Sequence, residues 1–180
     1  MNARRTYFTY FGFLFIILVI VGYSARNVLF RPWTARSWVT SATLGSRIFV
    51  FGGKNSQNDL MKDVLVVDPG ANTLKRVGSQ PTDLFGSSAA TVDGRIYLAG
   101  GTDNRSITDR IERYDPAAKH LVPFGRLPGP RTFGGMVVSG GLLFYLGGWD
   151  GRRTSDDIIR IDPNTGSASV VAHLPVPLEQ

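Results

Sequence analysis

The chain alternates between short apolar runs and clusters of glycine, proline and aspartate. Three of the apolar runs end in a pair of glycines, at residues 47–53, 95–101 and 142–148. Each run is apolar at consecutive positions, which is typical of a strand that is covered on both faces. The 21 glycines and 10 prolines divide the chain into segments too short for long helices. This pattern predicts an all-β domain.

Two sets of landmarks repeat along the chain with one period. The glycine pairs are 48 and 47 residues apart, and three Asp-Pro steps are each separated by 47 residues. The residues are Gly52, Gly53, Gly100, Gly101, Gly147 and Gly148 for the pairs, and Asp68, Asp115 and Asp162 for the steps. A period of 40 to 50 residues built from strands is typical of a β-propeller or a repeat array.

Each repeat reads as four strands. A strand of small residues leads through a tight turn, such as Asp93-Gly94 or Gly140-Gly141, into the apolar strand that precedes the glycine pair. A polar loop, a third strand, the Asp-Pro turn and a fourth strand follow. We expect the paired glycines at positions that need a positive φ or a close backbone approach, because both exclude a side chain.

These motifs resemble the kelch family of β-propellers. The resemblance rests on the Gly-Gly pairs, the Tyr114-Asp115-Pro116 triplet and the arginines Arg36 and Arg131 at the start of the first strand, and it covers residues 36–180. It implies three four-stranded blades over about 37–84, 85–130 and 131–180. The sequence departs from the family pattern at four positions: Leu74, Leu121 and Ala168 replace the usual tryptophan, and Leu84 replaces the middle arginine.

Three blades make an open or half propeller, because closed rings have about four to eight blades. The two end faces are then apolar and uncovered, and such patches mark interaction surfaces. We therefore expect a protein partner. It is either a second copy of the chain, which gives a six-bladed ring, or another subunit in a hetero-complex. A shortened derivative of a larger gene is the third option.

The first 25 residues predict a single transmembrane α-helix. Residues 6–25 carry no charge, and a helix of that length crosses a hydrocarbon core of roughly 30 Å. Arg4 and Arg5 favour a cytoplasmic N-terminus. We interpret residues 1–25 as an uncleaved signal anchor, with a cleaved signal peptide as the alternative. Residues 26–36 form a juxtamembrane linker, and the repeat domain, 37–180, is periplasmic or extracellular.

The composition excludes several kinds of chemistry. The chain has no cysteine, which rules out disulfides, thiolate catalysis and cysteine-ligated metals, and its two histidines, His120 and His173, fall on fourth strands. The net charge is +6, but no block of Lys or Arg is longer than two. We therefore predict no enzyme activity, no cofactor, no metal and no nucleic-acid partner.

The loops after the glycine pairs are the predicted partner-binding surface, because the kelch resemblance gathers them on one rim. Trp149 with Arg152 and Arg153 is the expected centre, since Trp and Arg carry most interface energy. The other candidates are Lys54, Arg105, Arg110, Arg36 and Arg131. The predicted function is a membrane-anchored binding or scaffold module, an accessory subunit of a membrane protein complex. The alternative is half of a homodimeric ring whose channel arginines, Arg36 and Arg131, act on or bind a glycan or sialic acid.

Overall fold

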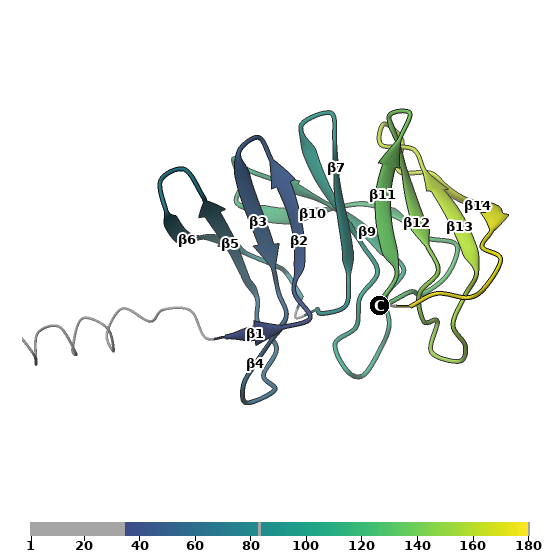
Figure 1. Ribbon diagram of the computed structural model, residues 1–180. Coiled ribbons are helices and arrows are strands. Elements are labelled where there is room, and N and C mark those ends of the chain that lie inside the picture. Colours follow the sequence, from purple (N-terminus) through teal and green to yellow (C-terminus); the bar gives the residue numbers. More distant parts are fainter. Residues whose placement is uncertain (1–34, 83, 180) are drawn as a thin grey trace, which may run out of the picture. The chain divides into compact units, whose positions relative to one another are not determined.

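The computed structural model describes residues 35–82 and 84–179, which form three four-stranded antiparallel blades (Figure 1). The first blade contains β2 (Thr40–Leu44), β3 (Arg47–Phe51), β5 (Asp63–Asp68) and β6 (Thr73–Ser79). The second contains β7 (Ser88–Val92), β8 (Arg95–Ala99), β9 (Arg110–Asp115) and β10 (His120–Arg126). The third contains β11 (Gly135–Ser139), β12 (Leu142–Leu146), β13 (Asp157–Ile161) and β14 (Ala168–His173). The predicted all-β blades are confirmed.

The predicted transmembrane helix, residues 6–25, lies outside the described residues. The strands all belong to one compact unit, Arg36–Gln180. In the described part of that unit, no helix is long and apolar enough to cross a membrane.

The blades meet through their innermost strands, with β7 between β2 and β11. A single parallel pairing of His120 with Ser79 also joins β10 to β6, so the first two blades form one eight-stranded sheet. A short pair, β1 (Arg36–Ser37) with β4 (Lys54–Asn55), lies at the loop edge of the first blade. The blades therefore stack in chain order and place equivalent loops at the same edge.

The tight turns and the glycine pairs have the predicted backbone conformations. Asp93 and Gly94 both have positive φ, at 50° and 68°, as a type I′ hairpin requires. All six paired glycines also have positive φ. A Cβ on the first glycine of each pair would fall on a carbonyl oxygen, that of Leu84, Arg131 or Leu178 in turn. The steric explanation for the pairs is thus confirmed.

The core consists of two apolar clusters, one at each junction between blades. Phe49 and Phe51 of the first blade pack with Ile96 and Leu98 of the second. On the other side of the second blade, a separate cluster joins its residues to those of the third: Tyr97, Ala99, Ile111, Leu143, Tyr145, Ile159 and Ile161. Alternate residues of β8 therefore point into different junctions, which explains why that strand is apolar at every position.

Candidate protein-binding rim

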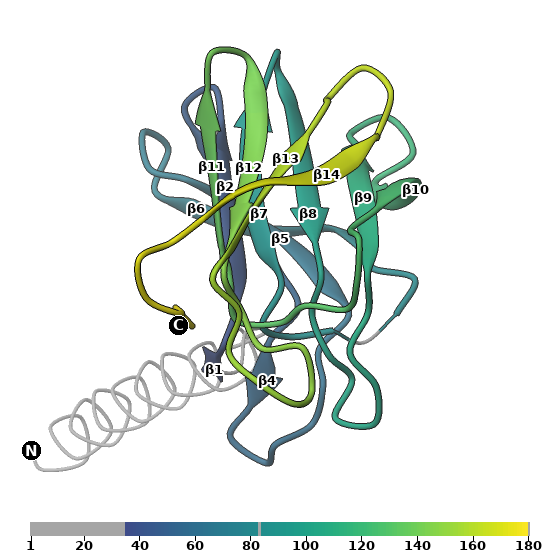
Figure 2. The ribbon, with the colours of Figure 1, turned by 90° about the vertical axis from the view of Figure 1, so that its right-hand side faces the viewer.

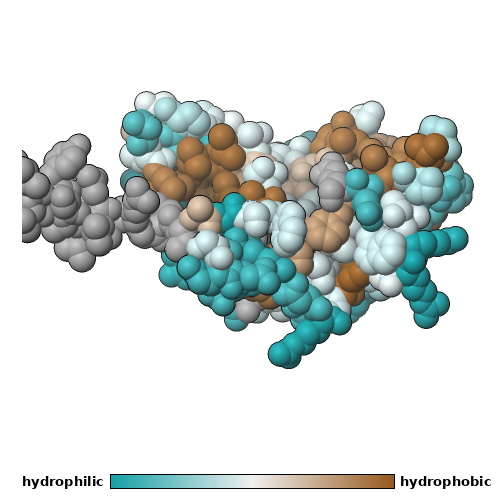
Figure 3. All heavy atoms as spheres, turned by 60° about the horizontal axis from the view of Figure 1, so that its bottom comes forward, coloured by the Kyte–Doolittle hydropathy of each residue, from teal (hydrophilic) through white to brown (hydrophobic). Residues whose placement is uncertain are grey.

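The loops that follow the glycine pairs lie at one edge of the blades, at the bottom of Figure 1. We call this edge the loop rim and define it as residues 52–62, 84–87, 100–109, 127–134 and 147–156. Figure 3 shows that hydrophilic side chains project from it, with hydrophobic residues exposed behind them. The loop rim is polar at its edge and apolar toward the strands, which is the composition of many binding surfaces.

Two loops of the rim are held in shape by an aspartate. The Asp103 carboxylate accepts hydrogen bonds from the backbone N–H groups two and three residues later, and Asp150 does the same. In each case the N–H three residues on has the largest effect, and together these bonds lower the pKa of both carboxyl groups below the usual value. In the first loop, Asn55 Oδ1 accepts hydrogen bonds from the backbone N–H groups two and four residues later. The loops are therefore preorganised, and the two carboxylates already accept hydrogen bonds from their own loops.

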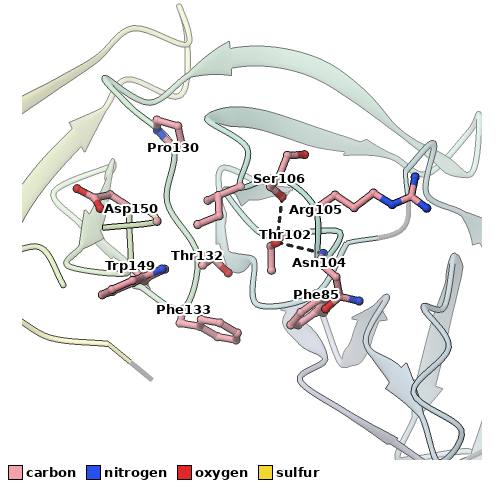
Figure 4. A pocket seen from close by; sticks show the side chains of 12 residues that line it. Phe85, Thr102, Asn104, Arg105, Ser106, Pro130, Thr132, Phe133, Trp149 and Asp150 are labelled. Atoms are coloured by element: carbon pink, nitrogen blue, oxygen red, sulfur yellow. Dashed lines mark hydrogen bonds between the residues drawn. The ribbon is translucent and has the colours of Figure 1, made fainter. Parts of the chain in front are cut away.

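A groove of about 510 Å³ crosses the rim between the second and third blades (Figure 4). Trp149, Phe133 and Phe85 lie along one side, and the 102–106 loop lies across from Trp149. Arg105 lines the groove, but its side chain extends away from Trp149. The other lining residues are Thr102, Asn104, Ser106, Ile107, Pro130, Thr132, Asp150 and Gly151. The predicted Trp149 thus belongs to a concave aromatic site.

Three aromatic rings from three successive repeats continue this site toward the first blade. Trp38 stacks on Phe85 with ring centroids 5.4 Å apart, and Phe133 lies 5.9 Å from Phe85. Trp38 remains 55% exposed although it is part of this cluster. The sequence pattern did not single out Trp38, Phe85 or Phe133 as candidate binding residues. The signal was present, because all three residues fall at the start of a repeat.

Lys54 is a rim candidate that the structure buries. Its side chain is covered by the rings of Trp38 and Phe85, with Nζ 5.0 and 3.9 Å from their centroids, and Nζ donates a 2.8 Å hydrogen bond to Asn104 Oδ1. The residue is 5% exposed. Its ammonium therefore joins the loops of the first two blades and stiffens the rim, as a cation held on aromatic faces does.

The two candidate arginines at the start of the repeats lie within their own blades. Arg36 pairs with Asp63 at 3.4 Å, and Arg131 pairs with Asp157 at 2.5 Å. Their side chains are 7% and 11% exposed. Each arginine thus neutralises the first carboxylate of the third strand, so both guanidinium groups are committed to the fold. The signal in the sequence was the repeated separation of arginine and aspartate, which is 27 and 26 residues.

The middle repeat lacks this ion pair, which accounts for the leucine that it has in place of the family's arginine. Where the other two repeats have an arginine and an aspartate, this repeat has Leu84 and Arg110, at the same spacing of 47 from Arg131 and Asp157. Leu84 is buried, and Arg110 is exposed at the start of β9. Both partners of the ion pair have been replaced together, so neither of these two positions leaves a buried charge without its partner.

The remaining candidates are exposed on the rim. Arg152 and Arg153 follow Asp150, and the Arg153 Nε atom lies 3.9 Å from that carboxylate with its side chain 85% exposed. Arg105 is exposed on the neighbouring loop. The structure thus brings Trp149 and Arg105 to one groove, places Arg152 and Arg153 on the adjacent turn and buries Lys54, Arg36 and Arg131.

One group of described side chains is close enough to hold a metal ion. His173 Nδ1 lies 3.5 Å from Asp156 Oδ1 and 3.4 Å from Asp157 Oδ1. The other oxygen of Asp157 is held by Arg131. This positive charge beside the carboxylate makes the group less favourable for a bound metal cation.

Glu112 is a buried acid in the described part of the chain. It lies on β9, opposite Leu98, and is 5% exposed. Burial raises the pKa of its carboxyl group, and Arg110 partly offsets that effect. Glu112 faces the junction between the first two blades and is not among the residues that line the groove.

The stacked, glycine-paired blades define an open β-propeller, and comparison with known proteins identifies its family. The KLHDC2/KLHL20/DRC7 kelch-repeats domain matches residues 25–174, so the chain belongs to the kelch-repeat family. It is 28% identical over 117 residues to beta-scruin of Limulus polyphemus, covering 57% of this chain and 13% of that protein. It is 31% identical over 114 residues to a putative F-box/kelch-repeat protein of Arabidopsis thaliana, covering 63% of this chain and 38% of that protein. It is 30% identical over 105 residues to kelch-like protein 21 of Danio rerio, covering 58% and 16%.

The aligned regions cover well under half of each of these relatives. The family relationship supports a role in protein–protein interaction, which agrees with the coarse prediction from the sequence.

Proposed function

We propose that this chain is a membrane-anchored kelch module that binds another protein through its loop rim, as an accessory subunit of a membrane complex outside the cytoplasm. The observation that carries the binding role is the aromatic groove formed by Trp149, Phe133 and Phe85. Aromatic side chains in a concave site are typical hot spots because they bury much area at a low cost in side-chain entropy.

The rigidity of the rim supports this role. Asp103 and Asp150 hold their loops through backbone hydrogen bonds, and Lys54 joins the first two loops from within the aromatic cluster. A surface that is already ordered loses little entropy on binding. The exposed arginines beside the groove, Arg105 and Arg152, add donors for acceptor groups of a partner.

Membrane attachment is supported by the uncharged stretch 6–25 that follows Arg4 and Arg5. An anchor of this kind confines the repeat domain to the membrane surface, where other membrane subunits are concentrated. Alkaline washing of membranes should leave the full chain in the pellet. Added protease should digest the repeat domain of intact cells, or of spheroplasts where the cell has an outer membrane, and spare the N-terminus. Release into the wash, or full protection, contradicts the proposed topology.

The binding role is tested by co-purification from the native membrane in mild detergent. We expect the full chain to retain specific membrane subunits, and Trp149→Ala combined with Arg105→Glu to lose them. Arg160→Glu is the matched control, because Arg160 is exposed on β13 and does not line the groove. An unchanged set of subunits with the double variant contradicts binding at the loop rim.

A further inference from the structure

The two junctions between blades are built by the same contacts. The outer strand of each blade carries a bulge, after which Gly78 pairs with Val64 and Gly125 pairs with Ile111. A Cβ on either glycine would fall on a carbonyl oxygen in the next blade, that of Lys119 or Gly166. The turn of the following blade therefore approaches the outer strand too closely for any side chain.

The third blade breaks this pattern on its open face. Its outer strand β14 has the same bulge and the same pairing, but Ala172 stands opposite Ile158, at the position of the two glycines. Ala172 is exposed and its Cβ projects where the turn of a following blade would have to lie. Since Lys119 and Gly166 present backbone at this point, a side-chain rotation in an adjoining blade does not relieve the overlap.

A second obstacle lies at the other end of the same face. The carbonyl oxygen of Arg131 accepts a 2.8 Å hydrogen bond from Gly101 N–H, where the third blade begins. At the equivalent place beyond the third blade, the carbonyl oxygen of Leu178 already accepts a 2.7 Å hydrogen bond from Gly148 N–H. The N–H group of Leu178 donates a 3.2 Å hydrogen bond to the carbonyl oxygen of Ser155. In Figure 2 the segment that follows β14 runs across the third blade toward its loop edge. A second copy would bring its Arg36 into the same slot.

Among the described residues, the open face of the first blade has neither obstacle. Ile48, Val50 and Val67 are half-buried there, while their equivalents in the second blade, Ile96, Leu98 and Tyr114, are buried against the blade before. The turn after β5 also has the same backbone conformation as the two turns that contact a preceding blade. Asn72 has a positive φ of 49°, and its equivalents Lys119 and Gly166 have φ values of 60° and 75°.

We propose that the first blade's open face docks a β-sheet of a different polypeptide, one with an apolar face and a glycine opposite the 68–72 turn, and that Ala172 and residues 174–179 prevent a second copy of this chain from taking that place. The homodimeric six-bladed ring is thereby blocked at both of its equivalent junctions, where the third blade of one copy would meet the first blade of the other. The inference concerns the blade faces, and it does not depend on the loop rim.

The test measures self-association of the full chain by native mass spectrometry in mild detergent. We expect the unaltered chain to be free of self-association through its blade faces. Ala172→Gly combined with deletion of residues 175–180 should strengthen self-association about tenfold or more and give a dimer. That dimer should be lost on adding Val50→Asp or Phe144→Asp, since a ring uses both faces. Ile48→Asp replaces Val50→Asp should the latter not fold, as judged by circular dichroism.

Three results overturn the inference. One is a dimer of the unaltered chain that both aspartate substitutions dissociate, because that dimer is the ring. Another is a dimer of the unaltered chain that only Val50→Asp dissociates, because the first faces then pair with each other. The third is a monomeric Ala172→Gly, tail-deleted chain, because Ala172 and the tail are then not the block. None of these results bears on partner binding at the loop rim.

Discussion

The second and third blades present the same strand positions to the side that follows them, but only the second blade has that side covered. Tyr97 and Ile111 are 1% and 0% exposed, whereas their equivalents Phe144 and Ile158 are half-buried. The local sequence is apolar in both places, so the neighbouring blade decides the burial. The two blades also differ at one position of the outer strand. The second blade has Gly125 there, and the third blade, after which no blade follows in the described structure, has Ala172.

The largest expected effect comes from equivalent truncations on the covered and the open side. Ile111→Ala should cost about 4 kcal/mol of unfolding free energy, because it leaves a cavity between packed blades, and Ile158→Ala only about 1 kcal/mol, because water reaches the site. Urea denaturation of the full chain, followed by circular dichroism, measures both. Equal losses would show that the third blade's face is covered after all.

The second comparison exchanges the outer-strand residues. Gly125→Ala should cost about 2 kcal/mol, because its Cβ meets the Gly166 carbonyl group and forces the blades apart. Ala172→Gly should cost less, about 0.5–1 kcal/mol, since it only adds freedom to the unfolded chain. Thermal unfolding of the two variants compares these effects. A Gly125→Ala chain as stable as the Ala172→Gly chain contradicts the proposed close approach.

The smallest effect concerns charge at the start of the third strands. Partial burial raises the pKa of the Asp157 carboxyl group, but its hydrogen bond with Ser155 and its ion pair with Arg131 lower that pKa by more, so the net pKa lies below the usual value for an aspartate. A lowered pKa contributes stability above the unfolded value that is lost as the pH falls through the folded value. Arg131→Leu should bring the pKa of Asp157 closer to its usual value. The unfolding free energy that is lost as the pH falls should then be smaller by about 1 kcal/mol.

The measurement is a carboxyl NMR titration of Asp157 together with unfolding at pH 6 and at lower pH. Arg110→Leu is the matched control in the second blade, because Arg110 replaces the aspartate there and Leu84 replaces the arginine. It should leave the Asp157 titration unchanged. An Asp157 titration that is the same with and without Arg131 contradicts the ion pair as the cause.

The repeat and its strands could be predicted because their signals are local. A glycine pair with positive φ, an Asp-Gly turn and an Asp-Pro turn each depend on a few neighbouring residues. Asp115, for example, accepts the N–H groups of Ala118 and Ala117, which lower the pKa of its carboxyl group. The aspartates of the other two Asp-Pro turns also accept backbone N–H groups, Asp68 from Ala71 and Asp162 from Asn164, so periodicity alone located these turns.

The site could be predicted only in part, because its contacts join residues that are distant in sequence. Trp149 and the arginine-bearing loops were identified as rim residues, but the cover over Lys54 comes from Trp38 and Phe85. A lysine after a glycine pair looks like an exposed charge in the sequence. Only the stacking of the blades brings the rings over its ammonium and places Asn104 within 2.8 Å of it.

The sequence by itself determined the number of blades and the strand order within each blade, because hydrophobic period and turn chemistry are local properties, and its resemblance to the kelch family implied that the loops gather at one edge. The tertiary structure alone decided which apolar faces are covered and which arginines are committed to ion pairs. It also gave meaning to Gly78, Gly125 and Ala172, which are spaced by 47 residues and so were visible from the start. Their significance lies in a carbonyl oxygen of the next blade, and packing between blades is what brings that oxygen close.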